Sequence, residues 1–304
     1  MLETNNHPIL DDIYYQLPYH WIKMSDTHNK KLIAFVEKMP AFPKSVQRVV
    51  QLTSDINAPA KEIVRVIESD PVMTVKILKV INSAFYGLPQ KITSIQRAVV
   101  HMGLNTIKNL ALSVAAMGVL KPNNDADFNT QDFLLHSLTT ASICRLLAEK
   151  LNVKPSECSD FFVAGLLHDF GKIVFAEFDP SNFKLALEHS LEKNIPLHEA
   201  EIEYMGINHA QVGKILAEKW ELDPTLIDAI EHHHDHDNKS LLTNCIATAN
   251  EISKKLQFGF SGNPIINESP DQVIPRFQLT LDDLILSLGD LSPIKSEALS
   301  FINS

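Results

Sequence analysis

Apolar residues recur at intervals of three and four along most of the chain from Pro43 onward, and this spacing predicts a succession of amphipathic helices. Residues 70–85 illustrate the pattern: an Asp-Pro pair is typical of a helix start, and Ile77 and Ile81 lie on one apolar stripe. No run with a period of two is long enough to predict a strand. We therefore expect an all-α protein.

A polar stretch rich in turn residues, KPNNDADFNTQD at 121–132, divides these helices into two groups. We expect an N-terminal helical lobe at 37–122 and a second lobe at 123–255. Residues 1–36 are expected to form an N-terminal extension, and residues 256–304 a tail with short helices. The helices expected in the second lobe span about residues 131–150, 159–178, 209–221, 224–235 and 242–256.

Composition narrows the class of protein. The formal net charge is −10, from 27 Lys and Arg against 37 Asp and Glu, which argues against binding a nucleic-acid polymer or an anionic membrane. The three cysteines lie far apart without CxxC spacing, which is typical of buried thiols in a reducing compartment. The N-terminus is polar and acidic, and the most apolar run, NLALSVAAMGVL, is too short to cross a bilayer. We therefore expect a cytoplasmic protein with no membrane partner.

A histidine and an aspartate interrupt the most apolar part of the second lobe. The segment SDFFVAGLLHDFGKIVF, residues 159–175, places His168 and Asp169 side by side where the pattern predicts a buried core. Burial of either group without a partner costs several kcal/mol, and a bound metal ion or an ion pair removes most of this cost. The pair is therefore a candidate for metal binding or for a catalytic role.

The helical register also turns other histidines toward the interior. His233 and His234 continue the apolar stripe of the helix expected at 224–235, whereas His232 and His236 fall outside it. Two more histidines share the inward orientation on other expected helices: His136 and His209. We therefore expect the inward-facing histidines to converge with the His-Asp pair, and His232 and His236 to lie at the edge or in solvent.

Imidazole and carboxylate together suit Mn, Fe, Zn or Ni, whereas Mg and Ca prefer oxygen ligands alone. Any one inward histidine is by itself more often a hydrogen-bonded core residue than a metal ligand, and the HHHDHD tract by itself is also explained as a solvated loop. Five such histidines beside a carboxylate, each on an apolar face, instead favour a metal centre or a proton-transfer centre.

These residues resemble the signature of the HD superfamily of metal-dependent phosphohydrolases, a lone His, then His-Asp, then further His and a final Asp on a helical bundle. HDFGK at 168–172 matches the HDxGK form of the related HD-GYP phosphodiesterases, and HAQVGKILAEKW and AIEHHHD match their later helices. The GYP segment is absent, because the chain continues HDNKSLL.

The first half of the chain resembles a more specific family within this superfamily. MPAFPKSVQRVVQL, IESDPVMTVKILKVINSAFYG and ITSIQRAVVHMGLNTIKNLAL are similar to the HDOD domain, an HD-related output module of bacterial signalling proteins. The similarity extends over residues 37–255 and implies a two-lobed helical bundle of HD-domain type. Many HDOD domains have lost the metal ligands and are thought to act through protein contacts, whereas this sequence keeps most of them.

Carried over residue by residue, the resemblance implies these metal ligands: His136 first, His168 and Asp169 as the central pair, and His209, His233 and His234 for the second ion. Asp169 would bridge the ions if two bind, and Lys172 would face a substrate phosphate. The final aspartate falls on Asn250, whose amide oxygen coordinates without bringing charge. We expect one or two divalent ions, Mn, Fe, Ni or Mg.

Two functions follow from the resemblance. The first is a signal-transduction regulator that retains a near-complete HD-type metal site and acts on signalling proteins. The alternative is an active phosphohydrolase that cleaves a cyclic dinucleotide or another phosphodiester with metal-activated water, Asp169 and Lys172 being the catalytic residues. Asn250 breaks the ligand set, which favours the regulator.

Overall fold

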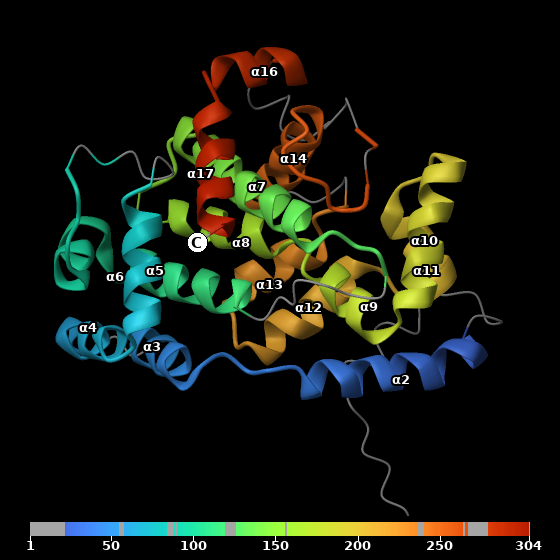
Figure 1. Cartoon of the computed structure of the whole chain (residues 1–304), viewed down its shortest axis with the longest axis horizontal. Coiled ribbons are helices and arrows are strands. Elements are labelled where there is room, and N and C mark those ends of the chain that lie inside the picture. The colour runs from blue at the N-terminus through green and yellow to red at the C-terminus, as the bar shows by residue number, and fades with distance from the viewer. Residues whose placement is uncertain are drawn as a thin grey trace, which may run out of the picture.

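Helices build the protein, whose computed structural model describes residues 22–54, 58–83, 88, 90–118, 126–155, 157–235, 240–263, 265–266 and 279–303. Every regular element in these ranges is a helix (Figure 1), so the predicted all-α fold is confirmed there. None of these helices combines the length and apolar character that crossing a bilayer requires. His236 and residues 121–125 of the expected boundary loop lie outside the described ranges.

Helix α2 (Ile22–Lys38) falls almost entirely within the expected N-terminal extension and packs against the second lobe. The N-terminal lobe contains α3 (Lys44–Ser54), α4 (Ala60–Glu68), α5 (Pro71–Ile81) and α6 (Ile95–Met117). The predicted helix start at Asp70 is confirmed, since its carboxylate accepts a hydrogen bond from the Met73 backbone N–H. Helices α3, α4 and α5 pack against α6, and Ile77 and Ile81 are fully buried in the core.

Helix α2 was not expected from the sequence, which is mostly polar at its start. Contacts from the second lobe hold it in place: Lys219 donates hydrogen bonds to the backbone carbonyls of Val36 (2.8 Å) and Met39 (2.7 Å) at the C-terminal end of α2. A cation at a helix C-terminus also interacts favourably with the helix dipole. Tertiary contacts therefore stabilise a helix that the local sequence pattern does not predict.

The second lobe follows in chain order as α7 (Thr130–Lys150), α8 (Cys158–Leu167), α9 (Gly171–Phe178), α10 (Pro180–Lys193), α11 (Leu197–Met205), α12 (His209–Lys219), α13 (Pro224–Glu231) and α14 (Leu241–Lys255). The long helix α7 packs against both α8 and α14. The two lobes meet where α6 contacts α8, and there the Asn109 amide donates to Ser159 Oγ (3.0 Å) and Asp160 Oδ1 (2.6 Å). The exact boundary between the lobes remains a prediction.

Two expectations for this lobe were wrong. The helix expected at 159–178 is two helices, α8 and α9, separated by a turn at 168–170. Helices α10 and α11 were missed, although Asp179-Pro180 is a start signal of the kind recognised at residue 70, and the Asp179 carboxylate does cap α10. The turn at 168–170 lifts the His-Asp pair out of a helix and points Asp169 into the middle of the lobe.

Gly171 makes the close packing of α9 against the start of α12 possible. A methyl group at its Cα would overlap the backbone carbonyl of His209, so α9 approaches α12 in a way that only glycine allows. We expect Gly171→Ala to lower the free energy of unfolding in urea by about 3 kcal/mol, the upper range for overpacking a tight contact. The control, Gly118→Ala, lies at an αR helix end with more room and should change it by less than about 1 kcal/mol. Equal effects of the two substitutions would contradict this account.

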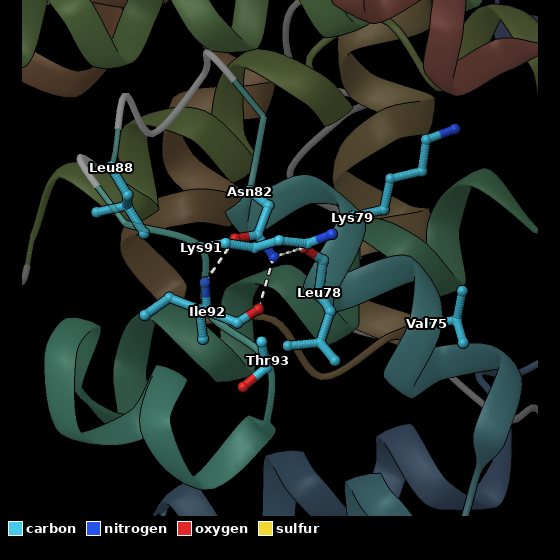
Figure 2. A pocket seen from close by; sticks show the side chains of 8 residues that line it. All are labelled: Val75, Leu78, Lys79, Asn82, Leu88, Lys91, Ile92 and Thr93. Carbon is cyan, nitrogen blue, oxygen red and sulfur yellow. Dashed lines mark hydrogen bonds between the residues drawn. The ribbon is translucent and has the colours of Figure 1, made fainter.

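In its described part, the C-terminal tail forms α16 (Leu281–Ser287) and α17 (Ser292–Ile302), and α17 packs against α7. Its last turn also reaches the N-terminal lobe, where Lys79 donates a hydrogen bond to the Ser300 carbonyl (2.9 Å). Lys79 lines a groove of about 790 Å³ beside α5 (Figure 2), whose other lining residues are Val75, Leu78, Asn82, Leu88, Lys91, Ile92 and Thr93. None of these side chains is a histidine or carboxylate, so the groove lacks the kinds of metal ligand that the histidine cluster contains.

Candidate metal centre

Four segments of the second lobe bring the predicted histidines together. Helix α7 carries His136, the α8–α9 turn carries His168 and Asp169, α12 begins at His209, and the turn after α13 carries His233 and His234. All of them are buried except His234, which is half-buried. Their arrangement agrees with the register expected from the sequence, although α13 ends before His233.

Asp169 lies at the centre, with imidazoles on both of its carboxylate oxygens. Oδ1 lies 3.1 Å from His209 Nε2 and 3.7 Å from His233 Nε2. Oδ2 lies 3.4 Å from His168 Nε2 and 3.9 Å from His136 Nε2. The carboxylate therefore stands between two groups of nitrogen donors.

Hydrogen bonds to the backbone fix the orientation of two of these rings. His168 Nδ1 lies 2.8 Å from the Gly165 carbonyl, and His233 Nδ1 lies 2.7 Å from the Ile230 carbonyl. Because a carbonyl only accepts, each Nδ1 carries a hydrogen, and each Nε2 faces the cluster. Both Nε2 atoms are buried and have no hydrogen-bond partner. This is the orientation of metal-ligating histidines.

His209 is held by a carboxylate that the sequence did not reveal. Glu201 on α11 is fully buried, and its Oε2 accepts from the His209 backbone N–H (2.8 Å) and lies 2.5 Å from His209 Nδ1. His209 Nε2 in turn lies 2.9 Å from His234 Nε2. His198, also on α11, stacks on His234 with ring centroids 4.1 Å apart. A correct prediction of α11 would have been needed to find either residue.

Burial and neighbouring charges set the protonation states. Burial lowers the pKa of His136 and His234 well below the usual range, and it lowers the pKa of His198 and His233 to about 3. These rings are therefore neutral near pH 7, as ligation requires. Burial alone would raise the pKa of Asp169, but His168 and Lys172 hold it well below the usual range, so Asp169 is ionised. Burial opposes protonation of His209, yet Glu201 raises its pKa.

Lys172 does not extend from the same helix as His168, because the chain turns between them. Its Nζ lies 2.6 Å from Asp169 Oδ2 and 3.4 Å from Ser261 Oγ, and the side chain is only 3% exposed. In this structure Lys172 pairs with Asp169, whereas the resemblance implied that it faces a phosphate. Its role in catalysis stays a proposal.

Asn250 is buried on α14, and its Oδ1 has no hydrogen-bond partner. It lies one turn before Ser253, whose hydroxyl accepts from Thr140, and the Thr140 hydroxyl is 3.5 Å from His136 Nε2. Helix α14 thus packs against α7 near His136, while Asn250 itself makes no hydrogen bond to the cluster through Oδ1. His232 caps α13 and is 36% exposed, which places it at the edge of the cluster.

Glu201 is expected to strengthen ligation by His209, since a carboxylate on the far ring nitrogen orients the ring and raises its basicity. We expect Glu201→Gln, which keeps an acceptor for the His209 backbone N–H, to weaken Mn²⁺ or Ni²⁺ binding about 10- to 100-fold in a chelator-competition titration. Glu203→Gln, on the same helix but exposed and paired with His189, is the matched control and should leave the affinity unchanged. Unchanged affinity in both variants would show that Glu201 has only a packing role.

A helical bundle with a central His-Asp pair, further inward histidines and a lysine one turn later is a protein of HD-domain type. A family model described as the HDOD domain matches residues 39–236, so the chain belongs to the HDOD domain family. Its fold is also that of an HDOD domain protein of unknown function from Geobacter sulfurreducens, with a TM-score of 0.74 at 24% identity over 92% of this chain and 99% of that one.

Two curated relatives match parts of longer proteins. One, described as uncharacterized, is from Treponema pallidum (strain Nichols) and is 26% identical over 250 residues, which cover 81% of this chain and 46% of that protein. The other is a ribonuclease Y from Mycoplasma mycoides, 28% identical over 155 residues, which cover 50% of this chain and 30% of the ribonuclease. The chain thus spans less than half the length of either relative.

Proposed function

We propose that this chain is an HDOD signal-transduction regulator whose HD-type cluster binds a divalent metal ion. One observation carries the proposal: the Nε2 atoms of His168 and His233 are buried, face Asp169 and have no hydrogen-bond partner. Leaving buried polar atoms unpaired costs free energy, and a metal ion held by these atoms offsets that cost. The residues present therefore fit the ion that the family resemblance implies.

The donor set indicates which ion fits. Imidazole nitrogens outnumber carboxylate oxygens around Asp169, and this composition suits Mn, Fe, Ni or Zn better than Mg. The ion would join α7, the α8–α9 turn, α12 and the end of α13, which are otherwise connected through packing. Binding of the ion would stabilise one arrangement of these segments, and signalling proteins would contact the lobe in that arrangement.

Burial favours the regulator over the enzyme. His136, His168, Asp169 and Lys172 are each at most 3% exposed, which leaves no open face on that side of Asp169 for a phosphodiester. The neutral Asn250 also stands where the resemblance implies a charged ligand. We further propose a cytoplasmic location, which agrees with three buried cysteines that form no disulfide.

A phosphohydrolase is the second candidate, supported by the half-buried His234 and His198 at the rim of the cluster and by the relative named ribonuclease Y. A bound ion would supply a water whose pKa is lowered from about 16 toward neutrality. Asp169 would help hold the ion, and Lys172 would have to leave Asp169 Oδ2 to face a nucleotide phosphodiester.

Metal analysis of the purified full chain tests the proposal. We expect inductively coupled plasma mass spectrometry to find bound Mn, Fe, Ni or Zn, and bis(p-nitrophenyl) phosphate to be turned over no faster than in buffer with added Mn²⁺ or Mg²⁺. Turnover that is lost in His168→Ala would favour the phosphohydrolase. A folded protein that binds none of these ions would exclude both metal-dependent functions.

A further inference from the structure

We infer that the centre holds a single divalent ion, on the Oδ1 side of Asp169, and that the Lys172 ammonium group takes the place of a second ion on the Oδ2 side. The inference rests on the proposed function and specifies how many ions the site binds. It also gives Lys172 a role within the site itself, as the buried counter-charge of Asp169.

The Oδ1 side has the ligands and the charge for one ion. Asp169, His209, His233 and His234 each offer a donor atom there, and these atoms lie within 4.8 Å of one another. Glu201 lies behind His209 at 2.5 Å from its Nδ1 and adds a second buried carboxylate to this side. His209 Nε2, His234 Nε2 and Asp169 Oδ1 converge at 2.9 and 3.1 Å, distances that a shared cation between them would replace with ligand bonds.

The Oδ2 side is already occupied by a positive charge. His136, His168 and Asp169 form a second group of donors within 4.8 Å, but Lys172 Nζ lies 2.6 Å from the same Oδ2 that an ion would share. Because Lys172 is 3% exposed, water does not screen its charge. Nζ also lies 3.4 Å from Ser261 Oγ, and a hydroxyl contributes no charge.

A count of the buried charges gives the same result. With the imidazoles neutral, as ligation requires, Asp169 and Glu201 with Lys172 leave one net negative charge, which one divalent ion converts to one positive charge. A second ion would leave three positive charges in a buried site, and Asn250 offers no carboxylate to offset them. On the neighbouring part of α14, Lys254 is paired with Glu251 at 2.9 Å, so this pair adds no net charge.

Metal stoichiometry tests the inference directly. The probe is Mn²⁺, titrated by equilibrium dialysis into the full chain, Lys172→Gln, and Lys172→Gln/Asn250→Asp. Lys172→Gln keeps a hydrogen-bond donor for Asp169 but removes the charge, and Lys172→Met is the second variant in case the glutamine packs poorly. The control is Lys214→Gln, which removes a lysine that is paired with Glu231 outside the cluster.

We expect one ion per chain in the wild type and in the control. Lys172→Gln should bind a second ion at least about tenfold more tightly than the wild type does, and the double variant should hold two ions. Electron paramagnetic resonance should show isolated Mn²⁺ in the wild type and an exchange-coupled pair in the double variant. Two ions in the wild type would overturn the inference but not the proposed function. A single ion in the folded Lys172 variants would likewise overturn the inference but not the proposed function. A wild type that binds no ion would overturn both the inference and the proposed function.

Discussion

Asp169→Ala is expected to abolish metal binding, reducing bound Mn or Ni from about one ion per chain to less than about a tenth of that value. Asp169 is the residue common to both groups of donor atoms, and its carboxylate contacts four imidazoles. Its removal takes away the charged ligand and leaves only neutral nitrogens. Plasma mass spectrometry after dialysis against the metal measures the loss.

The same substitution should also destabilise the fold, because it leaves the buried Lys172 ammonium without its counter-charge. Breaking one partner of a buried ion pair costs about 3–5 kcal/mol, whereas replacing both partners with apolar groups is often neutral. Asp169→Ala/Lys172→Met should therefore recover most of the free energy of unfolding in urea and still bind no metal. Metal retained by a folded Asp169→Ala would show that the cluster binds ions without the central carboxylate.

Several helices were predictable because their start signals and apolar stripes are local. The helices expected at 131–150, 209–221 and 242–256 match α7, α12 and α14 to within about two residues. The inward orientation of His233 and His234 was also predicted from the register, although both residues lie in the turn after α13 and not on the helix. These features depend on residues three or four positions apart, which a single sequence displays.

The missed features depend on contacts between distant segments. Glu201 precedes His209 by eight residues, and only the turn between α11 and α12 brings its carboxylate to the ring. The close approach of α9 to the His209 backbone, which Gly171 allows, is likewise a contact that no local pattern records. The ion pair between Asp169 and Lys172 has the spacing of a helical i,i+3 pair, but its burial became visible only in the fold.

Asn250 offers the most direct way to change what the centre binds. By the family resemblance, an aspartate at this position would supply the charged oxygen ligand that the pattern expects, and its charge would offset that of Lys172. Losing a supporting hydrogen bond to a ligand typically costs 10- to 100-fold in metal affinity, and a charged ligand itself contributes more. We therefore expect Asn250→Asp alone to raise the affinity for a second Mn²⁺ by more than about 100-fold, whereas two ions per chain are expected only when Lys172 is replaced as well.

The matched control is Asn244→Asp, since Asn244 is also buried on α14 with an unpaired Oδ1 but is six residues away along the helix. Its carboxylate should lower stability without changing the metal content, because nothing in the cluster contacts it. A phosphodiester assay on Asn250→Asp then asks whether the completed ligand set is sufficient for turnover in so buried a site. If neither the wild type nor Asn250→Asp binds metal, the cluster is a hydrogen-bonded core that no longer needs an ion, and a regulator acting through protein contacts alone is the function that stands.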